Sequence, residues 1–185
     1  MGFLRYAFAW GAAPDAPSGA TAFSYHRSLR PVLWALLSAS LLETAVLHLL
    51  LARLWSLRGS LILLAVSLLG LIWLIGLINS LTQLPILVSG AGVRVRSGLL
   101  VDQWLPLEQI AAVNVVADPG DLKRPELLKA SLLAYPNVLL QLAKPLSVRG
   151  RGGRMRAIST VALRPDDAAG FATAVAMAKR KAADA

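Results

Sequence analysis

The sequence predicts an α+β membrane protein, in which a transmembrane hairpin of two helices precedes an antiparallel β-barrel or sandwich capped by a C-terminal helix. Three observations predict this fold class. Of the 185 residues, 56% are hydrophobic, and the apolar excess is concentrated between Val32 and Ile78. From Pro85 onward the pattern changes to short apolar runs, some alternating with period two, which is typical of strands. The last stretch, residues 167–181, has apolar residues at helical spacing.

Residues 1–30 are predicted to be an irregular segment. Its apolar run, Tyr6–Ala13, is short, and the Pro-containing stretch 14–17 ends it, which argues against a secretory signal. Residues 24–30 are basic and aromatic, a composition that suits the headgroup region of a membrane.

Residues 31–80 are predicted to form the transmembrane hairpin. The first span covers residues 32–52 and the second covers residues 61–78, so they hold 21 and 18 residues. About 20 apolar residues are needed to cross the hydrocarbon core of a bilayer. The alternative is a pair of buried helices in a soluble all-α protein. Neither run has the continuous polar face of a soluble amphipathic helix, which favours the membrane interpretation.

Residues 85–181 are predicted to form the soluble domain, followed by a short tail at 182–185. Asp166 is the expected N-cap of the terminal helix, which presents Phe171 and Val175 on one face. An amphipathic helix of this kind can close the open end of a barrel. A polar loop is expected over residues 118–129, and the expected strands are 86–88, 93–97, 99–105, 110–116, 137–142, 146–148, 154–159 and 161–163.

This layout resembles that of bacterial membrane proteins in which two transmembrane helices are followed by a pleckstrin-homology-like (PH-like) domain. The likeness covers about residues 24–178. It implies a PH-like fold and a membrane-anchored binding or scaffolding domain, and it carries no catalytic residue onto this chain. The motifs that carry it are Gly92–Gly98, Trp104–Ile110 and Asp166–Phe171, together with the first span containing Glu43 and His48 and the later stretch Ala134–Val138.

One polar stripe interrupts the first span. Its four residues fall within an arc of about 140° on a helix: Ser40, Glu43, Thr44 and His48. Glu43 lies near the midpoint of the span, where an acidic group is costly and usually has a partner or a function. In an antiparallel hairpin it is level with Ser67 and Gly70, and Ser67 offers one hydroxyl group. We therefore expect either that the Glu43 carboxyl is neutral or that another helix supplies its partner.

Two interpretations of this stripe are open. A proton relay or metal site would need more ligands than one Glu and one His, and a transporter needs more spans. The favoured interpretation is a hydrogen-bonded contact inside the membrane, either within the hairpin or with another subunit.

A basic loop is the second candidate site. Between residues 127 and 165 there are seven basic residues and no acidic one. The alternatives are a loop that faces anionic lipid or a protein partner and a plain solvated hairpin loop. Nucleic-acid binding is not expected, since Tyr135 is the only aromatic residue available for stacking there. The candidate residues are Lys144, Arg149, Arg151, Arg154 and Arg156.

No catalytic motif, cofactor site or small-molecule substrate is expected, and the absence of cysteine excludes disulfides and thiolate metal sites. The acidic residues Asp118, Asp121 and Glu126 are expected to solvate their loop rather than to bind a metal. The chain carries a net charge of +9, and residues 86–185 contribute 14 basic and 8 acidic residues.

The expected function is that of a non-enzymatic, membrane-anchored module that binds a protein partner, an anionic lipid surface, or both. The alternative is an accessory or assembly subunit of a larger membrane complex, in which the polar stripe is the working interface with another membrane protein or a second copy. The expected location is the inner membrane, and the distribution of arginine around the spans predicts that both termini are cytoplasmic.

Overall fold

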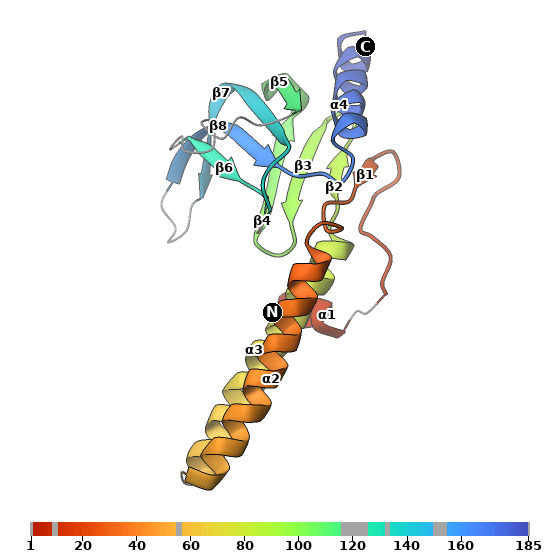
Figure 1. The fold of residues 1–185 in the computed structure, drawn as a ribbon. Helices are drawn as coiled ribbons and strands as arrows, with labels where there is room; N and C mark the ends of the chain where they lie inside the picture. The colour runs from red at the N-terminus through yellow and green to blue at the C-terminus, as the bar shows by residue number, and fades with distance from the viewer. Residues whose placement is uncertain are drawn as a thin grey trace.

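The structure, a computed structural model, describes residues 2–8, 11–54, 57–115, 126–131, 134–149 and 155–184. A long helical hairpin projects from one end of a compact α+β domain (Figure 1). In chain order the elements are α1 (Gly2–Phe8), β1 (Thr21–Phe23), α2 (Arg30–Leu54), α3 (Leu57–Gln83), β2 (Ile86–Val88), β3 (Gly92–Ser97), β4 (Val101–Pro106), η1 (Leu107–Gln109), β5 (Ile110–Val115), β6 (Leu127–Lys129), β7 (Val138–Arg149), β8 (Met155–Leu163) and α4 (Ala168–Ala183).

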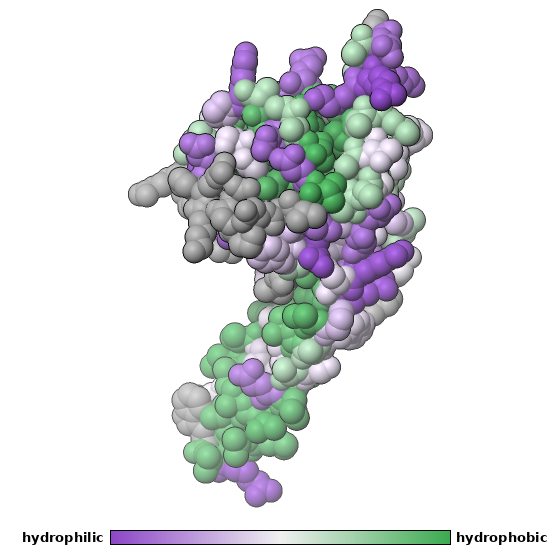
Figure 2. All heavy atoms as spheres, turned by 45° about the horizontal axis from the view of Figure 1, so that its top comes forward, coloured by the Kyte–Doolittle hydropathy of each residue, from purple (hydrophilic) through white to green (hydrophobic). Residues whose placement is uncertain are grey.

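The hairpin consists of α2 and α3, which have 25 and 27 residues and are therefore about 38 and 41 Å long. Both are long and apolar enough to cross a membrane, with mean hydropathies of 1.8 and 2.9 over their most apolar stretches. Only 6% and 22% of those stretches are buried. Figure 2 shows the result as a largely hydrophobic hairpin surface, with hydrophilic residues at its tip and where it joins the domain.

The domain contains two four-stranded sheets. The first is antiparallel and has the order β1-β2-β3-β4, while the second has the order β5-β7-β8-β6. The prediction of a purely antiparallel domain is wrong in one place, because β6 pairs with β8 in parallel. β6 also lies at the end of the stretch 118–129 that was expected to be loop, of which residues 118–125 lie outside the described part of the chain.

β7 and β8 are each one long, continuous strand. The sequence predicts two short strands in place of each: 137–142 and 146–148 for β7, and 154–159 and 161–163 for β8. They are antiparallel over most of their length, with a shift of register between Gln141 and Leu146. Pro145 lies at this irregularity and cannot donate a ladder hydrogen bond. The sequence signal for a break is therefore real, but it marks a bulge within a strand and not the end of one.

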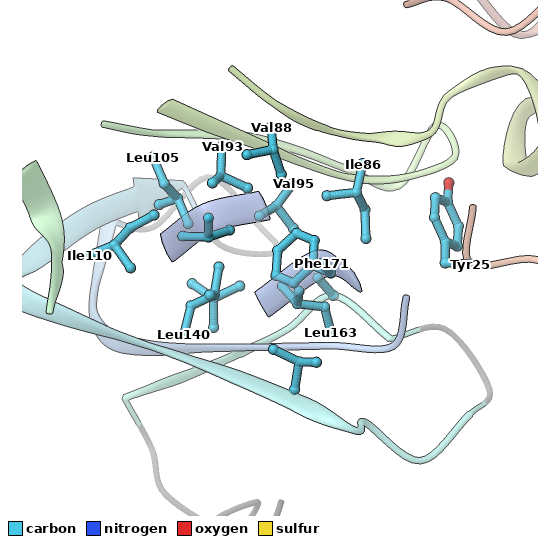
Figure 3. Close-up of a cluster of buried hydrophobic side chains, with 14 of the residues drawn as sticks. Tyr25, Ile86, Val88, Val93, Val95, Leu105, Ile110, Leu140, Leu163 and Phe171 are labelled. Carbon is cyan, nitrogen blue, oxygen red and sulfur yellow. The ribbon is translucent and has the colours of Figure 1, made fainter. Parts of the chain in front are cut away.

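The core lies between the two sheets and is closed by α4. Phe171 and Val175 of α4 are fully buried among strand residues from both sheets, and Figure 3 shows Phe171 among Val95, Leu140 and Leu163. The helix begins one residue later than predicted. Asp167, and not Asp166, is the N-cap, since its carboxylate accepts a hydrogen bond of 2.8 Å from the Gly170 N–H. Asp166 instead accepts one from the Arg27 N–H at 3.3 Å.

The N-terminal segment, expected to be irregular, contributes two ordered elements. α1 packs against α3, where the Asn79 side chain donates to the Tyr6 carbonyl at 3.0 Å. β1 pairs antiparallel with β2 and extends the first sheet. β2 is equally short but is an apolar run, Ile86–Val88, whereas β1 has no such pattern and is defined only by its pairing with β2.

Candidate functional site

Two residues of the polar stripe on α2 have hydrogen-bond partners, one within α2 and one on α3. Thr44 Oγ1 donates to the Ser40 carbonyl at 2.8 Å, so it is satisfied within its own helix. His48 Nδ1 lies 3.2 Å from Ser60 Oγ, which is buried on α3. The hairpin therefore supplies His48 with a partner that the sequence analysis did not anticipate.

Glu43 is left without such a partner. Its side chain is exposed and forms no hydrogen bond or ion pair with any residue that the structure describes. It lines a groove of about 370 Å³ between α2 and α3, and the opposite wall contains Ser67 and Gly70, as the antiparallel alignment predicts. No atom lies within 4 Å of where a Gly70 side chain would begin, so the groove is open at this position.

The basic loop is only partly described. Lys144 and Arg156 are exposed on neighbouring strands, and Arg156 Nη2 donates to the Leu127 carbonyl at 3.2 Å. Arg149 ends β7, while Arg151 and Arg154 lie outside the described residues. The expected clustering of all five basic residues therefore stays a prediction.

The acidic loop is likewise described only at its end. Glu126 accepts a hydrogen bond of 2.8 Å from the Ser159 hydroxyl, while Asp118 and Asp121 lie outside the described residues. Within the described residues, no group of three or more His, Cys, Asp or Glu side chains is placed to hold a metal ion.

A buried polar junction joins the hairpin to the domain, and sequence reasoning missed it. α3 ends at Gln83 and β2 begins at Ile86, so two residues connect them. Tyr25 occupies this corner. Its hydroxyl donates to the Leu84 carbonyl at 3.0 Å and accepts from the Gly98 N–H at 2.7 Å. Burial raises the pKa of the Tyr25 phenol above its usual value, which keeps the hydroxyl protonated as a donor.

Arg96 is the charged member of this junction. It lies on the outer face of β3, yet its side chain is only 2% exposed, because the N-terminal segment covers it. Arg96 Nη2 lies 3.0 Å from an Asp15 carboxylate oxygen, and Nη1 donates to the Asp15 carbonyl at 3.1 Å. The Asp15 N–H in turn donates to the Gln83 carbonyl at 2.8 Å. Asp15 thus ties the N-terminal segment to the sheet through Arg96 and to the end of α3 through its own N–H.

A second arginine on the same strand is solvent-facing. Arg94 forms two hydrogen bonds of 2.7 Å with the Asp102 carboxylate, and the side chains are 41% and 51% exposed. The Arg94 guanidinium holds the pKa of Asp102 below its usual value. The contrast between Arg94 and Arg96 comes from the segment that covers one of them and leaves the other in water.

No protein-family model, curated protein or solved structure matches this chain. The described residues offer an exposed carboxyl on an apolar hairpin, exposed cations on the domain and a two-residue connection between the two.

Proposed function

We propose that this chain is a membrane-anchored, non-catalytic binding module, in which α2 and α3 span the bilayer and a PH-like domain binds a protein partner or an anionic lipid surface. The observation that carries the proposal is the exposed apolar surface of the hairpin. Large side chains halfway along both helices, such as Leu42 and Leu69, are 67% and 65% exposed. A contiguous apolar surface of this extent is stable only when lipid or protein covers it.

The ends of the hairpin support a spanning arrangement. Trp34 on α2 is 48% exposed and lies 19 residues before Arg53, which corresponds to about 29 Å along the helix. That length matches a hydrocarbon core of about 30 Å. Tryptophan and arginine at opposite ends are the residues expected at the two membrane surfaces.

The domain supports the binding part of the proposal. Two sheets enclose one core that α4 closes, an arrangement in keeping with the PH-like assignment. Lys144 and Arg156 are exposed on the second sheet, and each cation near an anionic membrane surface contributes about 1 kcal/mol of attraction. Inner-membrane location with a cytoplasmic domain brings these cations to the leaflet surface that is richest in negative charge.

The test of the anchor is extraction of isolated membranes with alkaline carbonate. We expect the wild-type chain to stay in the pellet. Leu42→Arg combined with Leu69→Arg should lower the membrane-bound fraction, because an arginine at the centre of a spanning helix costs about 2.5 to 3.5 kcal/mol. Met177→Arg, on an exposed face of α4, is the matched control and should have no effect. Release of the wild-type chain by carbonate would refute the anchor.

The groove beside Glu43 favours a second candidate function, that of an accessory or assembly subunit whose hairpin binds another transmembrane helix. Because His48 is matched by Ser60 and Glu43 is not matched within the described hairpin, the missing partner is expected from outside it. A second copy of this chain or a different subunit could supply that partner. A buried carboxyl without one costs more than a typical interhelical hydrogen bond contributes, about 0.6 kcal/mol.

Two substitutions at this position separate the possibilities. Glu43→Leu should leave insertion intact, since the span becomes more apolar, but should weaken co-purification of the partner or recovery of the oligomer in mild detergent. Glu43→Gln should have a smaller effect, because the amide keeps its hydrogen-bonding capacity at nearly the same shape. If both variants retain the wild-type assembly, the stripe is not an interface.

A further inference from the structure

A groove of about 530 Å³ opens where the N-terminal segment crosses the hairpin, at the end of the hairpin nearest the domain. It is distinct from the Glu43 groove and from the basic loop. Three parts of the chain form its walls: the segment before β1, the stretch from His26 into the start of α2, and the end of α3. The lining includes His26, Arg30, Leu33 and Trp34 on one side and Ile78 and Thr82 on α3.

The polar lining of this groove has two basic side chains available to a ligand. Arg30 is exposed and forms no ion pair with any described residue. His26 is half-buried, and burial together with the Arg30 charge lowers the pKa of its imidazole. The charges that act on His26 are Arg30, Arg27 and Asp166, so positive charge predominates.

The other polar side chains of the lining already have hydrogen-bond partners. The Asn79 amide donates to the Tyr6 carbonyl at 3.0 Å, and Thr82 Oγ1 donates to the Asn79 carbonyl at 2.8 Å. An anionic ligand would therefore be recognised by Arg30 and His26.

The groove changes from polar to apolar in the direction of the hairpin tip. On the wall that includes the start of α2, Leu33 and the exposed ring of Trp34 lie closer to the hairpin tip than His26 and Arg30 do. Trp34 is about 6 Å along the helix from Arg30. On α3, Thr82 lies nearest the domain and Ile78 about one turn closer to the tip. A membrane phospholipid has this same order, with its charged headgroup outside the hydrocarbon and its chains within it.

We propose that this groove binds one anionic phospholipid, whose phosphate contacts Arg30 and His26 and whose upper acyl chain lies along Trp34 and Ile78. The proposal rests on the membrane anchor proposed above, because only a bilayer would hold the groove at headgroup depth. A soluble phosphate would contact Arg30 and His26 alone and leave the Trp34 side of the groove empty. The polarity gradient therefore favours a lipid as the occupant.

The experiment uses the full-length chain, purified in mild detergent and equilibrated with equal amounts of phosphatidylglycerol and phosphatidylcholine. Native mass spectrometry then counts the lipids that each molecule retains. We expect one retained phosphatidylglycerol in preference to phosphatidylcholine. Arg30→Gln should lower that retention about tenfold, the loss expected for a charge-assisted hydrogen bond. His26→Gln should lower it less, and neither change removes a buried core residue.

The matched control is Arg53→Gln, which makes the same change at the opposite end of α2 and should leave retention unchanged. Equal retention of the two lipids, or an equal loss in the Arg53 variant, would refute a specific groove. Displacement of the lipid by 10 mM inorganic phosphate would identify a general anion site and overturn the commitment to a lipid. A chain that resists carbonate extraction but shows no lipid preference would refute the groove while leaving the anchor intact.

Discussion

Gly98, in the turn between β3 and β4, packs against the end of α3. It has a positive φ of 51°, and its N–H donates to the Tyr25 hydroxyl. A Cβ atom at this position would lie 2.6 Å from Ser80 Oγ and 3.1 Å from a methyl group of Leu81. Ser80 and Leu81 are themselves buried, so they have little room to move away. Glycine is therefore required here for both conformation and space.

Gly98→Ala should lower the stability of the domain by at least about 1 to 2 kcal/mol, the cost of placing an L-residue in the left-handed region, with the contact to Ser80 adding to it. Gly90→Ala is the matched control, because Gly90 has no positive φ and no atom within 4 Å of an added Cβ. Thermal unfolding of the two variants in the same detergent, followed by circular dichroism, measures the difference. Equal melting temperatures would contradict the structure of this junction.

Individual residues also show where sequence reasoning ends. The alternation in β3 predicts correctly that Val93 and Val95 face the core, and both are fully buried. The same alternation places Arg96 in solvent, but the N-terminal segment covers it and Asp15 pairs with it. No local pattern could reveal that contact, because the two residues are 81 positions apart. The polar stripe was visible because all its members lie on one helix, whereas the Ser60 partner of His48 required the observed hairpin register.

Among the elements, α4 shows how much of the domain depends on one helix. Phe171 is fully buried and packs edge-on against Phe23 of β1, with ring centroids 5.4 Å apart and an interplanar angle of 87°. At the other end of the helix, Lys179 Nζ donates to the Ile110 carbonyl at 2.6 Å and to the Ala111 carbonyl at 3.3 Å. These carbonyls lie at the bulge in β5, so α4 both fills the core and supplies hydrogen bonds to an irregular strand.

Phe171→Ala should destabilise the domain by about 3 to 5 kcal/mol, because it removes a fully buried aromatic side chain and leaves a cavity. It should also release β1 from its contact with α4, so that limited proteolysis cuts the N-terminal segment sooner. Met177→Ala, on the same helix and 65% exposed, should change stability by less than about 0.5 kcal/mol. Similar urea midpoints for the two variants would mean that α4 does not close the core.

Elements with strong periodicity were predictable, and elements defined by pairing were not. The two long helices, strands β2 to β5 and helix α4 all follow from apolar runs, alternation or helical spacing. β1 and β6 carry no such pattern, and they are defined by their hydrogen bonds to β2 and β8. The same limit applies to the groove at Arg30, whose walls come from three separate parts of the chain.

At the scale of the whole molecule, the connection between hairpin and domain is only two residues long, and hydrogen bonds hold it at Gln83 and Leu84. The Gln83 and Leu84 carbonyls at the end of α3 accept from the Asp15 N–H and from the Tyr25 hydroxyl, respectively. Tilting of α3 therefore cannot be absorbed by a flexible linker and would move β2 directly. This short connection suits the proposed membrane anchor, because it would hold one face of the domain at a fixed height above the membrane.

The distribution of arginine along the hairpin indicates which side of the membrane the domain occupies. Arg27, Arg30, Arg94 and Arg96 lie at the domain end of the hairpin, whereas Arg53 and Arg58 lie at its tip. This excess of arginine predicts that the domain and both termini are cytoplasmic. Green fluorescent protein fused to the C-terminus should fluoresce, while alkaline phosphatase at the same place should be inactive. Phosphatase inserted in the connection between α2 and α3 should be active. Active phosphatase at the C-terminus would reverse the orientation and would place the groove at Arg30 on the outer leaflet.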